Sequence, residues 1–342
     1  MDSITIRDVA KLCGVGVSTV SRAMNNHPDI NQETKDRIMQ IITEYHYIPN
    51  NSARNLKRTD AKTIAVLIKG ISNPFFSKMI TIFEQEIQKK RYSFILQHVE
   101  EKQDEIAVAI QLEKEKRLNG IVFLGGFFSH TEDKLKQISV PFVLSTIGLL
   151  ENHNKQIYSS VSVDDVKESY KVVKHLLDLG HKRIAILSAL EEDESIGRLR
   201  LEGYKQALLE AGLPIDPALI CPMYEELEGY SMENGYAVAR DLLASGKDFT
   251  AIYAVSDAVA IGACRALRDA GKEIPRDFSV AGFDGLEIGR YYYPAITTLR
   301  QPVEEMAEAT IKILFDVMKK KTSVQHRIFE GTLIEGESAR KI

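Results

Sequence analysis

Residues 14–28 read GVGVSTVSRAMNNHP, and this stretch decides the fold of the first part of the chain. Gly14 is expected to end one helix, because glycine is the usual residue just past a helix end. A second helix is expected to begin near Gly16 and to bury Val20 and Ala23. The small hydroxyl residues and the arginine of this second helix are poor core material, so they are expected to face a polar partner.

Helices are also expected on either side of this stretch. Thr5 and Asp8 have the spacing of a capping box, which marks a helix start. After the turn NNHPDI, Asn31 can cap a third helix that carries Ile38 on its apolar face. Two short helices across a glycine turn, braced by a third, form a helix-turn-helix pattern. The pattern predicts an all-α head over residues 1–48.

The second helix carries groups that suit the major groove of DNA. In helix-turn-helix proteins this helix lies in the groove with its first residues at the base edges. Arg22 can pair with guanine through two hydrogen bonds, and Val17 can touch a thymine methyl group. Hydroxyl side chains and the helix N-terminus can hold phosphates. The alternative is a solvated helix with a capped start, and the segment that follows favours DNA.

Residues 47–58, YIPNNSARNLKR, form that segment. Pro49 breaks the third helix, and Asn50 can cap a new one that is too short to be stable alone. Ala53 and Leu56 would share a face with nothing of their own to pack on. A leucine flanked by arginine and lysine suits a wedge that enters a minor groove beside phosphates. The alternative is a plain solvated linker.

From Thr63 onward, apolar stretches such as TIAVLIKG and RIAILS alternate with amphipathic helices. This alternation predicts α/β architecture with doubly wound parallel sheets. A body of about 280 residues is large for one sheet, so two similar lobes are expected. The predicted divisions are a hinge helix and linker over 49–62 and a body over 63–342, with an N-lobe of about 63–160 and 293–323 and a C-lobe of about 161–292 and 324–342.

The composition is that of an ordinary globular protein and excludes several classes. The 342 residues are 44% hydrophobic and 27% charged, and the three cysteines form no CxxC pair, so neither a disulfide framework nor a zinc site is expected. The sequence shows no signal peptide and no membrane-spanning stretch, so we expect a cytoplasmic protein with no membrane partner. Residues 1–62 hold nine Lys/Arg against seven Asp/Glu, whereas the whole chain carries −4, so a mildly basic head precedes an acidic body.

Two other classes of protein fit the sequence less well. Doubly wound sheets host many enzymes, but there is no GxGxxG after the first strand, no GxxxxGK[ST] and no GxSxG. We therefore expect no catalytic residue, no metal and no cofactor. A transport-type sugar-binding protein would share the body, but it would need an export signal and would lack the head.

Polar and aromatic residues follow several predicted strands, which is where open parallel sheets bind ligands. Aromatic faces with one arginine and carboxylates suit a polyhydroxylated small molecule such as a sugar. Structural alternatives are a loop cap for Asp284, a salt bridge for Arg200 and the ordering of a strand end for Asp257. The predicted effector-binding residues are Asn73, Phe75, Phe76, Leu124, Thr146, Arg200, Tyr230, Ser256, Asp257 and Asp284.

Together these motifs resemble the lactose/galactose repressor family of bacterial transcription regulators. The matching stretches, in family order, are TIRDVAKLCGVGVSTVSRAMNN, YIPNNSARNLKR, SNPFF, LGHKRIAIL, RLRLEGYKQAL, AVSDAVAIGA and VAGFDG. The resemblance implies a homodimer that binds palindromic double-stranded operator DNA, with a hinge helix and a body like that of periplasmic sugar-binding proteins. It implies base contacts by Val17, Ser18 and Arg22, a base-step wedge at Leu56, and backbone contacts by Thr5, Thr19, Ser21, Asn25 and Asn50.

The sequence departs from the family pattern at a few positions. Gly16 stands where serine is usual, Thr146 replaces a frequent acid, and Ser256 is shorter than the common asparagine, so no particular sugar is assigned. Gln301 and Pro302 resemble one of the three lobe crossovers. The chain ends without leucine heptads, which favours a dimer over a tetramer. An alternative within the family is the catabolite-control branch, whose main signal is a phosphorylated carrier protein bound on the N-lobe.

Overall fold

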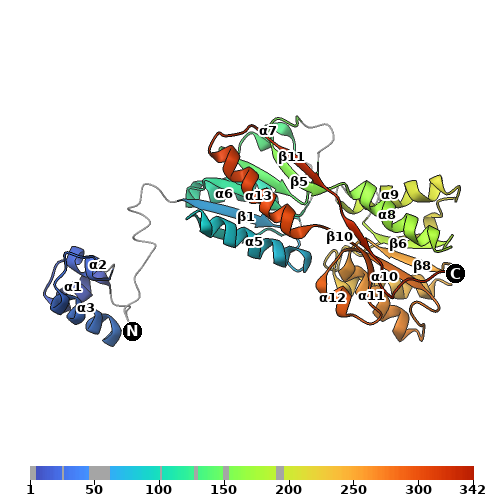
Figure 1. Cartoon of the computed structure of the whole chain (residues 1–342), viewed down its shortest axis with the longest axis horizontal. Helices are drawn as coiled ribbons and strands as arrows, with labels where there is room; N and C mark the ends of the chain where they lie inside the picture. Colours follow the sequence, from blue (N-terminus) through green and yellow to red (C-terminus); the bar gives the residue numbers. More distant parts are fainter. Residues whose placement is uncertain are drawn as a thin grey trace. The chain divides into compact units, whose positions relative to one another are not determined.

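The computed structural model divides the chain into two compact units, Met1–Ala61 and Lys62–Ile342 (Figure 1). Four of the predicted DNA contacts, Asn25, Asn50, Ala53 and Leu56, lie outside the residues that the structure describes. The described residues are 5–24, 27–45, 62–100, 102–126, 130–148, 154–189 and 196–342.

The first unit contains the three predicted helices. The capping box at Thr5 and Asp8 is present, Gly14 takes the left-handed conformation with φ 65°, and the Asn31 side chain accepts a hydrogen bond from the Glu33 amide. A small core holds the helices together, formed by Val9, Ala10, Cys13, Val20, Ala23 and Ile38. The helices are α1 (Ile6–Cys13), α2 (Val17–Met24) and α3 (Gln32–Glu44).

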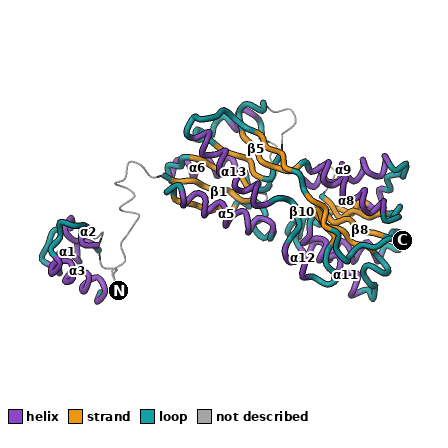
Figure 2. The backbone as a smooth tube through the Cα atoms, in the orientation of Figure 1, coloured by secondary structure: helices purple, strands orange, loops and turns teal. Residues whose placement is uncertain are grey.

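The described residues of the second unit form two six-stranded sheets. Helices lie against the strands of both lobes in Figure 2. The N-lobe sheet is parallel throughout, in the order β11-β5-β4-β3-β1-β2. Its strands are β1 (Thr63–Ile68), β2 (Ser93–His98), β3 (Gly120–Leu124), β4 (Phe142–Ser145), β5 (Ser159–Val163) and β11 (His326–Phe329). Its helices are α5 (Phe75–Lys89), α6 (Glu105–Lys116), α7 (Glu132–Leu135) and α13 (Val303–Met318).

The C-lobe sheet has the order β12-β10-β9-β8-β6-β7 and is parallel except for the β10–β12 pair. Its strands are β6 (Ile184–Ser188), β7 (Ile220–Pro222), β8 (Ala251–Ala254), β9 (Ser279–Asp284), β10 (Thr297–Arg300) and β12 (Thr332–Ile334). Its helices are α8 (Asp165–Asp178), α9 (Ile196–Glu210), the short η1 (Pro217–Leu219), α10 (Met232–Ala244), α11 (Asp257–Asp269) and α12 (Glu287–Tyr291). No helix in the described ranges is both long enough and apolar enough to cross a membrane.

The chain passes between the lobes three times, and the crossings correct the predicted lobe limits. It leaves the N-lobe after β5, returns through Gln301 and Pro302 between β10 and α13, and leaves again between β11 and β12. The assignment of 293–323 to the N-lobe is wrong for β10, and that of 324–342 to the C-lobe is wrong for β11. Strands of three or four residues are too short for their hydrophobic pattern to reveal which sheet they join.

Helices α10 and α11 cross so closely that glycine is required on both. A Cβ atom added at Gly262 would lie 2.0 Å from the Met232 carbonyl oxygen, and one at Gly235 would lie 2.3 Å from the Val259 carbonyl oxygen. The atoms in the way are backbone, so they cannot rotate aside as a side chain would.

We therefore expect Gly262→Ala to lower the free energy of unfolding by about 1–3 kcal/mol, as overpacking of a core does. Urea denaturation of the full chain measures this change. Gly289→Ala is the matched control, because its Cβ would meet nothing closer than 3.5 Å. Equal stabilities for the two variants would contradict this account of the crossing.

Candidate functional site

Helix α2 exposes one face and buries the other. Val20 and Ala23 lie in the core of the head, whereas Val17 is 42% exposed and Ser18 and Arg22 are also exposed. The predicted base-reading side chains therefore share the solvent face of a fixed helix. Gly16 directly precedes that helix, and its carbonyl oxygen accepts hydrogen bonds from the amides of Thr19 and Val20.

The predicted backbone contacts lie beside this face. Thr19 and Ser21 are half-buried on α2. Thr5 is exposed at the start of α1, and its hydroxyl donates a hydrogen bond to the Asp8 carboxylate at 2.6 Å. Thr5 thus fixes the first turn of α1.

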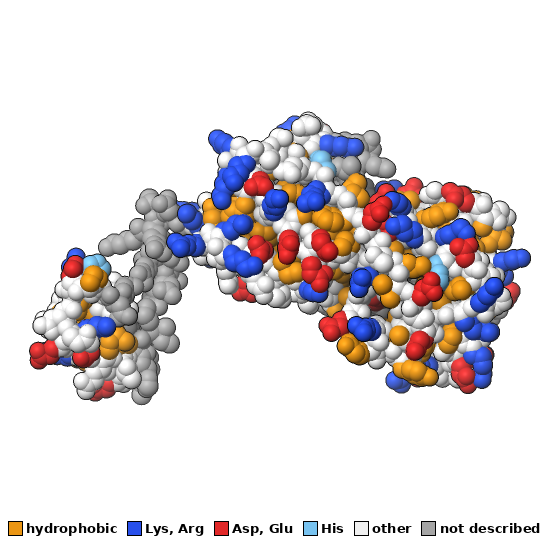
Figure 3. Space-filling view, in the orientation of Figure 1, with side chains coloured by type: hydrophobic (Ala, Val, Ile, Leu, Met, Phe, Trp, Pro, Cys, Tyr) orange, Lys and Arg blue, Asp and Glu red, His pale blue; other side chains and the backbone are white. Residues whose placement is uncertain are grey.

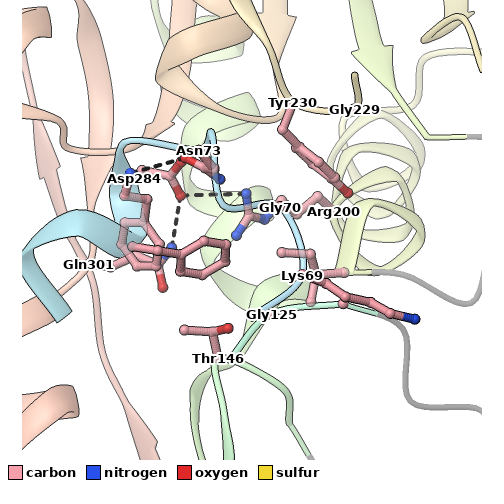
Figure 4. A pocket seen from close by; sticks show the side chains of 14 residues that line it. Lys69, Gly70, Asn73, Gly125, Thr146, Arg200, Gly229, Tyr230, Asp284 and Gln301 are labelled. Atoms are coloured by element: carbon pink, nitrogen blue, oxygen red, sulfur yellow. Dashed lines mark hydrogen bonds and ion pairs between the residues drawn. The ribbon is translucent and has the colours of Figure 1, made fainter. Parts of the chain in front are cut away.

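A pocket between the two lobes collects most of the predicted effector residues (Figure 4). Its cavity of about 70 Å³ is several times the roughly 10–15 Å³ that one water molecule needs. The predicted residues in its wall are Asn73, Phe75, Phe76, Thr146, Arg200, Tyr230 and Asp284. The wall also contains Lys69, Gly70, Gly125, Gly126, Ile196, Gly229 and Gln301, which we had not predicted as effector residues.

The N-lobe supplies the apolar side of the pocket. The Asn73 side chain accepts a hydrogen bond from the Phe75 amide at 3.0 Å and so fixes the entry to α5. The first turn of that helix carries Phe75 and Phe76, whose rings meet edge to face at 5.6 Å between centroids. Such faces can cover the apolar side of a sugar ring while polar groups bind its hydroxyls.

The C-lobe supplies the charged side. The Arg200 Nε donates to the Asp165 carboxylate at 2.8 Å, and the Arg200 Nη1 donates to the Val255 carbonyl. The guanidinium lies 3.7 Å from the centre of the Phe283 ring. Asp284 Oδ1 accepts from Gln301 Nε2 at 2.9 Å and lies 3.7 Å from Arg200 Nη1, as the dashed lines of Figure 4 mark.

Two polar atoms of the pocket are buried without a hydrogen-bond partner. They are Asp284 Oδ2 in the C-lobe and Thr146 Oγ1 in the N-lobe. An unsatisfied buried polar atom is costly, so each one calls for a bound group. A carboxylate oxygen accepts hydrogen bonds, and a threonine hydroxyl both donates and accepts, so hydroxyl groups of a ligand fit both positions.

Backbone strain also gathers at this pocket. Thr146, Tyr230 and Asp284 have φ values of 68°, 56° and 115°, a region that non-glycine residues enter at an energetic cost. Strain of this kind persists where the surrounding structure holds a side chain in place for function. The three residues come from both lobes: Thr146 and Tyr230 lie in loops, and Asp284 is the last residue of β9.

Burial leaves the acids of the C-lobe side poorly stabilised as anions. Burial raises the pKa of Asp284 to about 7, although Arg200 and the hydrogen bond from Gln301 oppose the shift. Burial and the neighbouring Asp284 charge raise the pKa of Asp257 to about 8. The pKa of Asp165 is also raised, mainly by burial. A ligand hydroxyl that donates to Asp284 would stabilise its ionised form.

Three predicted effector residues do not line the pocket. Leu124 is fully buried in the N-lobe core. The Ser256 side chain caps α11 by accepting a hydrogen bond from the Val259 amide. The Asp257 carboxylate accepts two hydrogen bonds at 2.6 Å, one from the Thr298 hydroxyl and one from the Leu286 amide. Ser256 and Asp257 follow β8 as predicted, whereas Leu124 is the last residue of β3 itself, and all three side chains are buried in the protein. The predicted alternative for Asp257, the ordering of a strand end, describes its contacts.

Sequence reasoning missed the glycines at the end of β3. A Cβ atom at Gly125 would lie 2.6 Å from the Phe76 ring, and one at Gly126 would lie 2.8 Å from the Lys69 side chain. The GG pair after an apolar strand was the available signal, because glycine in such a place often marks a close approach. Lys69 itself ion-pairs with Glu105 at 2.5 Å, and its amino group points away from the pocket in Figure 4.

Comparison with known proteins identifies the family of this chain. Residues 5–50 match the model of bacterial regulatory proteins of the lacI family, and residues 173–339 match that of the periplasmic binding protein-like domain. The chain is 41% identical over 342 residues to the HTH-type transcriptional regulator MalR of Clostridium butyricum, covering 99% of this chain and 100% of that protein.

Two solved structures share the architecture. One is a transcriptional regulator CelR–cellobiose complex, with a TM-score of 0.72 and 27% identity, covering 98% of this chain and 99% of the other. The second is a LacI family transcriptional regulator from Enterococcus faecium with bound ribose, with a TM-score of 0.70 and 28% identity, covering 82% and 100%. The chain belongs to the lacI family of bacterial regulatory proteins, and it is a DNA-binding transcriptional regulator rather than an enzyme.

Proposed function

We propose that this regulator is a repressor that binds a palindromic operator as a homodimer and whose affinity changes when a neutral sugar or similar polyol occupies the pocket. The observation that carries the proposal is the pair of buried, unpartnered atoms, Asp284 Oδ2 and Thr146 Oγ1. They belong to different lobes of one pocket, so a single ligand with several hydroxyl groups can satisfy both.

The ligand is expected to be neutral because the pocket offers little positive charge. Among the described residues of its wall, the cations are Arg200 and Lys69. Arg200 already binds Asp165 and the Val255 carbonyl, and Lys69 binds Glu105. A phosphate group would therefore lie beside buried carboxyls without a cation to receive it. The cellobiose and ribose bound by the two similar structures are consistent with a neutral sugar.

Ligand binding would be coupled to DNA binding because both lobes contribute residues to the pocket. A ligand that binds one arrangement of the lobes better than another shifts the population toward it. Gln301 donates to Asp284 at the crossover between β10 and α13, and Lys78 on α5 ion-pairs with Glu304 on α13. The ligand would thus act on the segment that leads from the pocket to the N-lobe helices.

An exposed aromatic surface on the C-lobe supports a homodimer. Tyr291 is 75% exposed, Tyr293 is 77% exposed and Ile288 is 47% exposed, all close together in the sequence. Large apolar side chains exposed this far, where they form one patch, mark an interface. Sedimentation of the purified chain tests the assembly: a dimer is expected, and a monomer at all concentrations would contradict it.

A thermal-shift screen of the full chain against sugars, polyols, sugar phosphates and nucleobases tests the choice of ligand. A ligand at one hundred times its dissociation constant stabilises the protein by about 2.7 kcal/mol, or about 4 °C in Tm. We expect a shift with a neutral sugar and none with its phosphorylated form. A shift only with charged ligands would contradict a neutral effector, and no shift across the panel would favour a phosphorylated protein corepressor.

A further inference from the structure

Strained backbone marks a second place besides the pocket. In the described part of the chain, six non-glycine residues have positive φ, and three of them line the pocket. The others are Arg91, Arg117 and Lys320, with φ values of 63°, 52° and 53°. They follow the C-terminal ends of α5, α6 and α13, so all three lie at the edge of the N-lobe sheet where its strands begin.

Glycine is the residue that usually follows a helix end in this conformation. The C-lobe uses it in the same structural setting, since α8, α9, α10 and α11 are followed by Gly180, Gly212, Gly246 and Gly271, all with positive φ. A cation near a helix C-terminus interacts favourably with the helix dipole. A cation would gain the same dipole interaction at the C-lobe helices, yet glycine occupies those positions, so the dipole alone does not explain the cations of the N-lobe. The N-lobe therefore keeps positive charge where backbone geometry favours glycine.

Further cations gather at the same edge of the sheet. Lys62, Lys90 and Lys319 come from three segments and surround one aromatic pair, Tyr92 and Phe315, whose ring centroids are 4.9 Å apart. Lys62 Nζ lies 5.8 Å from the Tyr92 ring, and Lys90 Nζ and Lys319 Nζ lie 5.4 and 5.9 Å from the Phe315 ring. Two backbone hydrogen bonds bring these segments together at this edge. The amide of Ser93, after α5, donates to the Lys62 carbonyl, and the amide of Asn119, after α6, donates to the carbonyl of Thr63 at the start of β1.

These six residues, Lys62, Lys90, Arg91, Arg117, Lys319 and Lys320, form what we call the amino-end cationic surface. All six are exposed, and none makes an ion pair with another residue of the described part of the chain, unlike Lys89, which pairs with Glu86. In Figure 3, blue side chains gather over the end of the N-lobe at which the chain enters the body. Exposed charge of one sign without neutralising partners attracts an anionic polymer.

We infer that the amino-end cationic surface binds the sugar-phosphate backbone of DNA that flanks the site read by the head. Lys62 is the first residue of the body, and residues 46–61 connect it to the head, a span of at most roughly 55 Å when extended. DNA bound by the head therefore stays within the reach of this connection from Lys62. The connecting segment carries Arg54, Lys57 and Arg58 against a single acid, Asp60. Because its net charge is positive, it would be repelled by the amino-end cationic surface rather than bind to it.

The triple variant Arg91→Gly, Arg117→Gly and Lys320→Gly tests this inference, which rests on the DNA binding of the family. The full chain is titrated with a fluorescent duplex of about 40 random base pairs between 50 and 200 mM NaCl. Each lost phosphate contact reduces the slope of log K against log salt concentration by about 1. We expect a slope smaller by about 2–3 and binding about 10- to 100-fold weaker at 50 mM NaCl.

The control is Lys182→Gln, Lys247→Gln and Lys272→Gln, which removes three cations from the C-lobe and should leave the slope unchanged. A glycine variant with the slope of the control, or a control that loses as much as the glycine variant, would overturn the inference. The Tm of the glycine variant should equal or exceed that of the wild type, and a lower Tm would show that the cations serve the helix ends. Failure of the wild type to bind any duplex would instead contradict DNA binding itself.

Discussion

Replacement of Asp284 by asparagine should weaken effector binding by about 100-fold or more while the chain stays folded. The carboxylate is buried, and its Oδ2 atom is expected to receive the hydroxyl groups of the ligand. Hydrogen bonds to a charged group contribute about 1.5–3 kcal/mol each, and the variant weakens more than one of them. Asparagine tolerates the positive φ of this position better than most residues do. Isothermal titration at pH 8 with a ligand from the thermal-shift screen measures the loss.

Asp257→Asn is the matched control, because Asp257 is equally buried but lies outside the pocket wall. Its contacts to Thr298 and Leu286 hold the loop after β9 rather than a ligand. We expect the ligand affinity of this variant to stay within about threefold of the wild type. Similar losses in both variants would mean that the loop, and not the Asp284 carboxylate, determines the affinity.

The same two variants also test how the stability of the ligand-free chain depends on pH. Because burial raises the pKa of Asp284 to about 7 and that of Asp257 to about 8, the folded chain holds protons that the unfolded chain releases near pH 4. The free energy of unfolding should therefore fall as the pH rises from about 4 to about 8. Each asparagine variant removes one of these protons and should flatten the fall. An unchanged pH profile in both variants would contradict the burial of ionisable acids here.

Replacement of Arg22 by glutamine should weaken specific DNA binding by about 10- to 100-fold. Arg22 is exposed on the solvent face of α2, where its guanidinium can form two hydrogen bonds to one guanine. A good bidentate contact is worth about 1–3 kcal/mol of discrimination against a wrong base. The probe is a duplex selected from a random library by the wild type, and the preference for guanine at one position of each half-site should be lost together with affinity.

Arg37→Gln is the control for Arg22, since it removes the same charge from an exposed position of α3. We expect this change to alter affinity for all sequences to a similar, small extent, because a phosphate contact carries no base preference. If Arg37→Gln changed base preference and Arg22→Gln did not, the assignment of α2 as the recognition helix would be wrong.

The head was predictable because its signals are local. The capping residues Thr5 and Asn31 and the glycine at 14 mark helix ends within a few residues, and the apolar positions recur at helical spacing. The strands of the body were predictable where they are long and apolar, as in β1 and β9. The three- and four-residue strands β7, β10, β11 and β12 and the polar β5 carry no such pattern, so the limits of the two lobes were misplaced.

The position of the pocket was predictable from the sequence, but the residues that line it were only partly predictable. The rule that ligands bind at the carboxyl ends of parallel strands located five residues of its wall, namely Asn73, Phe75, Phe76, Thr146 and Asp284. Arg200 and Tyr230 were added to them as side chains that complete the wall. The rule does not say which side chain after a strand turns outward, which is why Ser256 and Asp257 were included although both face the protein. Backbone strain is absent from a sequence, so the positive φ values of Thr146 and Arg91 could only come from the structure.

The central claim is that occupation of the pocket changes the affinity for DNA. The direct test is the dissociation constant of the full chain for a duplex that it has itself selected, measured at one salt concentration with and without a saturating sugar from the screen. We expect a change of about 5- to 150-fold, the usual range of coupling between two sites. In the Asp284→Asn variant the same sugar concentration should leave DNA affinity unchanged. Equal affinities of the wild type with and without the sugar would contradict the account.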